Sequence, residues 1–240
     1  MLVQKLDSIF YPDFQGNWDD EIFRTVVIDH LKSDMILLDV GAGSGRLIQM
    51  NFKDKCKKVV GLDPDESVMT NPNLHEAHIA LGGDMPFEDE TFDIVISDNV
   101  WEHVEKPGDF LEEIRRVLKP GGQYLAKTPN KLHYVPLLAN MTPHWFHQLY
   151  NSLRGRSADD TFETHYKLNS RAAIFRHARE AGFVVDFFKS YEGRPEYLRI
   201  SSLTYLFGIV YERLVNLSRL FERFRVIHIV ILRKESSTSP

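Results

Sequence analysis

Short apolar runs alternate with stretches of helical spacing through most of the chain. The runs predict strands at 35–40, 59–62, 92–97 and 124–128. The spaced stretches predict helices at 19–32, from a glycine-rich turn to about residue 50, at 109–118 and at 170–181. Strands that alternate with helices favour a parallel sheet, because each parallel pairing needs a crossover connection.

The last part of the chain has a different order of elements. A strand is predicted at 183–189, a long amphipathic helical stretch at 196–225, and a final strand in the apolar run 226–232. We therefore expect an α/β protein with a doubly wound, mostly parallel sheet and a helical insertion before its last strand.

The composition is that of an ordinary folded protein, with 43% hydrophobic and 26% charged residues among 240. We expect a single domain over 1–235 and a disordered tail at 236–240. The single cysteine, Cys56, excludes an intramolecular disulfide and a cysteine-ligated metal cluster.

The net charge of −5 offers little attraction for the phosphates of a nucleic acid, so no nucleic-acid partner is expected. The N-terminal residues lack the basic start and apolar run of a signal peptide. No run reaches the roughly 18 apolar residues that a membrane-spanning helix needs. These features predict a cytoplasmic protein.

A glycine-rich turn, LDVGAGSG, begins at Leu38 and connects a predicted strand to a predicted helix. Glycines let a backbone turn sharply and approach a ligand closely. Dinucleotide enzymes place their third glycine one position later, where this chain has Arg46. Asp39, two residues before the first glycine, repels a pyrophosphate and suits an ammonium group. The turn therefore favours S-adenosylmethionine, which carries an ammonium, a sulfonium and no phosphate.

Two further carboxylates follow the turn. Asp63 ends the second apolar run, where it can accept hydrogen bonds from both ribose hydroxyls, or alternatively cap a helix ahead of Pro64. Asp84 can accept from the adenine amino group, while the Met85 backbone addresses the ring edge. Ligands of parallel sheets bind outside the carboxyl ends of the strands. We therefore expect the turn, Asp63 and residues 98–103 around one crevice.

Four segments stand in order along the chain: LLDVGAGSGRL, VVGLDPDESVM, GGDMPFEDETFDIVISDNVWEHV and FLEEIRRVLKPGGQYLAKTPN. Together they resemble the class I S-adenosylmethionine-dependent methyltransferases, most closely the branch with the ubiquinone-biosynthesis and related small-molecule methyltransferases. The resemblance implies a Rossmann-like sheet of seven strands with the last one antiparallel. It divides the domain into a helical cap at 1–34, a cofactor-binding core at 35–130 and an acceptor-side segment at 131–181.

The resemblance also implies which residues contact the cofactor. The expected set is Asp39, Gly41, Ala42, Gly43 and Gly45 at the methionine end, Asp63 and Pro64 at the ribose, Asp84 and Met85 at adenine, and Asn99 and Val100 along the cofactor. In the ubiquinone O-methyltransferases, an acidic residue linked to metal binding stands where this chain has Asn99. No metal site is therefore expected.

Methyl transfer requires the acceptor atom to lose a proton. His103 follows a strand on the ligand side and is suited to accept that proton near neutral pH. Many enzymes of this branch carry the same Glu-His-Val whatever their acceptor, which leaves a structural role open. Four side chains before the last helices are candidates for the acceptor side, with packing as the alternative for each: His144, Trp145, His165 and Tyr166.

The amphipathic stretch 196–225 is basic within an acidic chain. Such a helix can lie on an anionic membrane surface. The alternatives are packing against its own sheet and a homodimer contact. On a membrane, the protein would be peripheral to the inner face, and a lipid-linked acceptor such as a glycan precursor or a prenylated quinone becomes attractive.

The sequence thus predicts an S-adenosylmethionine-dependent methyltransferase that acts on a small or lipid-linked acceptor, with oxygen as the expected acceptor atom. Two alternatives remain open. One is an NAD-dependent oxidoreductase. The other is a non-catalytic module of the same fold that serves as an interaction or membrane adaptor.

Overall fold

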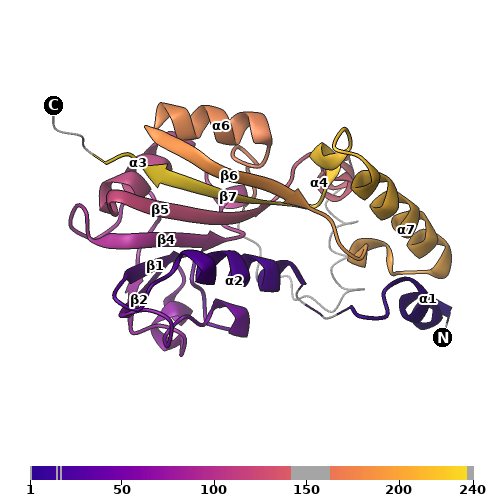
Figure 1. Cartoon of the computed structure of the whole chain (residues 1–240), viewed down its shortest axis with the longest axis horizontal. Helices are drawn as coiled ribbons and strands as arrows, with labels where there is room; N and C mark the ends of the chain where they lie inside the picture. The colour runs from indigo at the N-terminus through magenta and orange to yellow at the C-terminus, as the bar shows by residue number, and fades with distance from the viewer. Residues whose placement is uncertain (1, 15, 17, 142–162, 237–240) are drawn as a thin grey trace.

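The computed structural model of the chain describes residues 2–14, 16, 18–141 and 163–236. Within these ranges, seven strands form one sheet in the order β3-β2-β1-β4-β5-β7-β6 (Figure 1). The strands are β1 (Ile36–Val40), β2 (Lys58–Asp63), β3 (Glu76–Ile79), β4 (Phe92–Asp98), β5 (Leu118–Pro129), β6 (Phe183–Tyr191) and β7 (Ile227–Lys234). β7 is antiparallel to both of its neighbours, and the pairings from β3 to β5 are parallel. The predicted fold class is confirmed.

The helices lie on both faces of the sheet and beyond one edge of it. The α-helices are α1 (Leu2–Phe10), α2 (Trp18–His30), α3 (Pro107–Val117), α4 (Tyr134–Met141), α6 (Arg171–Glu180) and α7 (Ser202–Leu217). Short 3-10 turns are η1 (Ile48–Met50), η2 (Glu66–Thr70), η3 (Trp101–His103), η5 (Glu196–Leu198) and η6 (Glu222–Phe224). The predicted helices at 19–32, 109–118 and 170–181 correspond to α2, α3 and α6, and α7 lies inside the predicted stretch 196–225.

Each face of the sheet is covered by helices whose apolar side chains point toward it. On one face, Phe110 and Ile114 of α3 and Ile174 of α6 join the buried cluster. On the other face, Phe23 and Val27 of α2 are completely buried against the strands. Proline at the start of α3 suits a first helical turn, because its N–H is not needed there.

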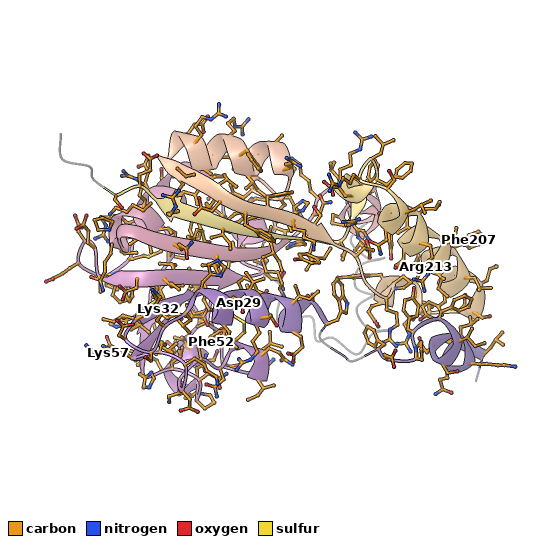
Figure 2. The ribbon with its side chains drawn as sticks, in the orientation of Figure 1. Asp29, Lys32, Phe52, Lys57, Phe207 and Arg213 are labelled. Atoms are coloured by element: carbon orange, nitrogen blue, oxygen red, sulfur yellow. The ribbon has the colours of Figure 1, made fainter. Side chains whose placement is uncertain are left out.

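The predicted helix after the glycine turn is wrong. Residues 41–57 form turns and the short η1 instead. In a helix, the backbone carbonyls of this segment would accept hydrogen bonds from backbone N–H groups further along the chain. Here, side chains from other elements donate to some of these carbonyls instead. The Arg24 guanidinium of α2 donates to the carbonyls of Gln49 and Asn51, and lies 5.2 Å from the centre of the Phe52 ring. Phe52 is buried beneath α2 (Figure 2), so this segment covers the α2 face of the sheet with side chains although it forms no α-helix.

The sequence pattern also does not predict β3. This strand has four residues at the edge of the sheet, and all four are exposed or half-buried. An edge strand with little buried surface shows no apolar run for a pattern to detect.

Three helices gather beyond the carboxyl ends of the parallel strands, where Figure 1 shows α1, α4 and α7 together. The Tyr205 hydroxyl of α7 donates to Asp7 of α1 at 2.5 Å, and Arg199 donates to the same carboxylate at 2.6 Å. The first and last α-helices of the described chain therefore pack on each other. None of the described helices has the length and apolar character to cross a membrane.

Candidate functional site

The glycine turn leaves β1 at the carboxyl edge of the sheet. The Gly41 N–H donates to the Leu62 carbonyl at 2.7 Å, which fixes the turn to β2. Gly41 has a φ of +78°, and a Cβ at this position would lie 2.3 Å from Cγ2 of Val100. Backbone conformation and a close neighbour therefore both require glycine here.

Two buried asparagines support the turn where the predicted helix is absent. Nδ2 of Asn71 donates to the carbonyls of Ala42 and Gly43, each at 3.0 Å, and Nδ2 of Asn73 donates to the Gly45 carbonyl at 3.2 Å. Sequence reasoning missed both residues. Asn-Pro-Asn reads as an ordinary surface turn, so the pattern does not reveal that these amides face inward.

Asp63 ends β2 and is 8% exposed. Its Oδ2 accepts the Gly43 N–H at 2.9 Å, and its Oδ1 accepts the Asp65 N–H at 2.8 Å. Each carboxylate oxygen has a further lone pair, so Asp63 can hold both loops and still accept from ribose hydroxyls. The helix-capping alternative does not apply, because Asp65 caps η2 through the Ser67 N–H.

Two cavities open at this edge of the sheet. The larger has a volume of about 730 Å³, and its lining includes Asp63, Pro64, Asp84, Asn99, Val100, His103 and His165. The smaller has a volume of about 220 Å³, and its lining includes Asp39, Ala42, Gly43, Gly45, Arg46 and Asn71. Gly41 and Asp98 line both. The structure therefore places all of the predicted cofactor residues except one around two adjoining cavities.

Met85 is the exception. Its side chain is buried in the core and lines neither cavity. Its N–H donates to Glu113 at 3.0 Å, and its carbonyl accepts from Arg116 at 3.0 Å. The structure does not support the prediction that this backbone addresses adenine, because side chains of α3 already engage both groups.

Two buried carboxylates, Asp39 and Asp98, lie where β1 and β4 meet the cavities. Burial raises the pKa of Asp39 well above its usual range, and the charges of Asp98 and Asp63 raise it further. Burial also raises the pKa of Asp98 to about 7. A bound cation stabilises the ionised form of such carboxylates. The pair therefore fits the ammonium group of S-adenosylmethionine.

Lys127 of β5 contacts Asp98 and is completely buried. Its Nζ lies 3.0 Å from Asp98, 3.0 Å from Asp19 and also in contact with Asp20. Burial alone lowers the pKa of Lys127, but the three carboxylates together raise it above its ordinary value. The contact with Asp98 is an ion pair with a completely buried lysine side chain.

Sequence reasoning also missed Lys127. The available signal was a lysine in the middle of the apolar run YLAKTP. Lysine is rarely buried completely unless it is paired, so its position in a predicted central strand indicated acidic partners nearby. Those partners, Asp19 and Asp20 of α2, are distant in sequence.

His103 and His165 both line the larger cavity. Nδ1 of His103 lies 2.9 Å from the Glu163 carbonyl oxygen. A carbonyl only accepts, so we assign the proton of the neutral ring to Nδ1 and the lone pair to Nε2. His165 is tied to the same region, because its N–H donates to the Glu102 carbonyl at 2.6 Å.

Of the other acceptor-side candidates, the described part of the chain includes Tyr166. Tyr166 is half-buried beside His165 but lines neither cavity, and burial raises the pKa of its hydroxyl to about 12. His144 and Trp145 lie outside the described residues.

Comparison with known families explains this arrangement. Residues 38–126 match a family model described as a methyltransferase domain. This part of the chain is therefore a methyltransferase domain. The matched residues run from β1 into β5 and include the glycine turn, Asp63 and His103. The match favours the methyltransferase prediction over the dinucleotide-dependent alternative.

Three relatives match this part of the chain. The chain is 32% identical over 105 residues to a protein of Mycolicibacterium smegmatis named as a probable S-adenosylmethionine-dependent methyltransferase, covering 42% of this chain and 40% of the relative. It is 37% identical over 103 residues to a ubiquinone biosynthesis O-methyltransferase of Nitrobacter winogradskyi, covering 40% and 39%. It is 31% identical over 109 residues to a tRNA U34 carboxymethyltransferase of Pseudoalteromonas atlantica, covering 41% and 34%. The aligned part spans two fifths or less of each relative, and the names of the last two indicate different acceptors.

Solved structures have the same fold as the described part of the chain. One is a chain of the complex between the Trm112 methyltransferase activator and a methyltransferase of Haloferax volcanii, with a TM-score of 0.61 at 17% identity and coverage of 100% of both chains. At this identity the likeness shows the methyltransferase fold alone.

Proposed function

We propose that this protein transfers the methyl group of S-adenosylmethionine to an oxygen atom of a small or lipid-linked acceptor. The observation that supports the proposal is the pair of adjoining cavities, which share Gly41 and Asp98. The smaller one suits the methionine end of the cofactor. The larger one, at about 730 Å³, has room for adenosine and for an acceptor beside the two histidines.

Each part of the cofactor has a matching group in this site. Asp39 and Asp98 suit the ammonium, and Arg46 lines the same small cavity and suits the carboxylate. Asp63 and Asp84 line the larger cavity and suit the ribose hydroxyls and the adenine amino group. The remaining part of the larger cavity, near His103 and His165, is left for the acceptor.

S-adenosylmethionine supplies a methyl group bound to a positively charged sulfur. The protein has to hold the acceptor oxygen in line with the carbon–sulfur bond. As the new oxygen–carbon bond forms, the carbon–sulfur bond breaks and its electron pair stays on sulfur. Nε2 of His103 takes the proton from the oxygen, while the Glu163 carbonyl holds Nδ1–H and keeps the ring in the required tautomer.

We expect His103→Gln to lower the rate of methyl transfer about a hundredfold, because glutamine cannot accept the proton. The affinity for S-adenosylmethionine should stay within about twofold of the parent, since His103 lies on the acceptor side. The measurement is transfer of a labelled methyl group to acceptors in a cell extract, with cofactor affinity determined by calorimetry. His78→Gln, on β3 and outside both cavities, is the matched control.

The same assay tests the proposed function. Mass spectrometry of the labelled product should place the new methyl group on oxygen. A product methylated on carbon or nitrogen contradicts the assigned acceptor atom. Absence of labelled product from every extract fraction contradicts the proposed activity, and an equal rate for His103→Gln and the parent contradicts the role of His103.

A further inference from the structure

An apolar stripe runs along the outer side of α7. Its residues follow the spacing of one helix face, and between 51% and 79% of each is exposed: Leu203, Phe207, Val210, Leu214 and Leu217. We call this set the α7 stripe. Figure 2 shows Phe207 on the outer side of α7, away from the sheet. The apolar spacing of this helix therefore does not mark a face packed against the protein's own core.

Specific contacts hold the α7 stripe outward. The opposite side of α7 buries Tyr205, Ile209 and Val215. Two of its polar groups form hydrogen bonds with α1 and the residue after it. The Tyr205 hydroxyl donates to Asp7, and Glu212 accepts from the Tyr11 hydroxyl at 3.1 Å. Rotating the helix to bury the stripe would break these bonds and expose its present core side.

The charges beside the α7 stripe are basic. Arg213, Arg219 and Arg223 are exposed along α7 and the turn after it. Of the two acidic residues of this segment, Glu212 is buried, and Glu222 is half-buried and forms an ion pair with Arg225 at 3.9 Å. An apolar stripe with exposed arginines and no exposed acid therefore stands on a chain whose net charge is −5.

This charge pattern favours one of two partners that could cover the α7 stripe, a second copy of the chain or a membrane. A second copy of the chain would bring the same arginines to the contact, and like charges repel. A bilayer that contains anionic phospholipid supplies apolar chains for the stripe and phosphates for the arginines. The acidic remainder of the protein is repelled from the same bilayer, which favours contact through this side alone.

We propose that the α7 stripe docks the protein on the surface of a membrane that contains anionic phospholipid. The leucines and Phe207 enter the boundary between headgroups and acyl chains, and Arg219 and Arg223 lie at the phosphates. α7 stands beyond the carboxyl ends of the parallel strands, the edge where both cavities open (Figure 1). The inference does not depend on the proposed activity, because docking requires neither cofactor nor acceptor.

Vesicle flotation of the full chain tests the docking. With phosphatidylcholine vesicles that contain a quarter of phosphatidylglycerol, we expect at least about tenfold more bound protein than with phosphatidylcholine alone, and a loss of binding as salt is raised. Binding that is equal on both vesicles, or absent from both, contradicts the proposal.

Two pairs of variants identify the surface that binds. Phe207→Ser with Leu214→Ser should lower binding about tenfold or more, because two apolar anchors are lost. The matched control is Met69→Ser with Ile79→Ser, two equally exposed apolar residues near β3, and it should bind like the parent. Equal loss in both pairs, or none in either, contradicts docking through the α7 stripe.

Charge reversal provides a second test that leaves the apolar residues in place. Arg219→Glu with Arg223→Glu should abolish the preference for anionic vesicles, and Arg176→Glu with Arg179→Glu on α6 should retain it. Analytical ultracentrifugation tests the alternative, in which a second copy of the chain covers the α7 stripe, by measuring the oligomeric state. A dimer that Phe207→Ser with Leu214→Ser dissociates would assign the stripe to a second copy and overturn the membrane assignment.

Discussion

Gly41→Ala is expected to weaken S-adenosylmethionine binding by about three orders of magnitude. Alanine at a φ of +78° costs about 1–2 kcal/mol, and its Cβ would lie 2.3 Å from Cγ2 of Val100. Such a contact in a packed site costs about 1–3 kcal/mol more. The ligand-free turn can relax away from this strain, whereas cofactor binding requires the original conformation. The free-energy cost of the alanine therefore lowers the affinity for the cofactor, and each loss of about 1.4 kcal/mol weakens binding tenfold.

Gly43 provides a matched control for this prediction. It also has a positive φ, +51°, but a Cβ there meets no atom within 4 Å. Gly43→Ala should therefore pay the conformational cost alone and weaken binding about tenfold. Adding Val100→Ala to Gly41→Ala should restore binding to the level of Gly43→Ala. Calorimetry measures all three, and an unchanged affinity for Gly41→Ala would show that the cofactor does not need this turn.

Lys127→Met is expected to lower the free energy of unfolding by about 3–5 kcal/mol near pH 7.5, the cost of removing one partner from a buried ion pair. Methionine has a similar volume, so the loss reflects charge more than packing. Asp19, Asp20 and Asp98 are then left together without the ammonium that neutralises them. Urea denaturation followed by circular dichroism measures the change.

The pH dependence of this loss has a definite sign. The pKa of Asp98 is raised to about 7 by burial, so the folded protein binds this proton more tightly than the unfolded chain does. Ionising Asp98 therefore costs stability as pH rises from about 4 to 7, and removing Lys127 increases that cost. The loss should be smallest near pH 5 and largest above pH 7.

A surface ion pair serves as the control for Lys127→Met. Lys119 pairs with Asp93 at 2.7 Å, and its side chain is 39% exposed. Lys119→Met should cost less than about 1 kcal/mol, because solvent screens this pair. An equal loss for the two variants, or a Lys127 effect that grows toward acid, would contradict a buried ionic support behind the cofactor site.

Much of the sheet, and most of the predicted residues that line the two cavities, could be found from local pattern. The strands β1, β2, β4 and β7 are continuous apolar runs because they are buried on both faces. Asp39, Asp63 and Asp84 follow from the chemistry that each part of the cofactor requires. These predictions depend on residues that are close together in the sequence, and a local sequence pattern contains that information.

The missed features depend on contacts between distant segments. Arg24, Asn71 and Asn73 capture the carbonyls around the glycine turn, and no local pattern in residues 41–57 indicates that. Lys127 acquires its role from α2, which lies about a hundred residues earlier. Similarly, the period of α7 predicted a helix correctly but could not indicate whether its apolar face is covered.

Calorimetric titration at pH 7.5 and at pH 5.5 tests whether these two cavities bind S-adenosylmethionine with its ammonium at Asp39 and Asp98. Below pH 7.5 the ligand amine is protonated, and burial has raised the pKa of both carboxylates in the free protein. Binding the ammonium must release their protons, so the affinity should fall on acidification, by up to about tenfold per pH unit for each proton released. Methylthioadenosine, which lacks the amino-acid part, should show little change. Failure of S-adenosylmethionine to bind at pH 7.5 would contradict a cofactor site in these cavities. The same pH dependence for both ligands would contradict the placement of the ammonium at Asp39 and Asp98.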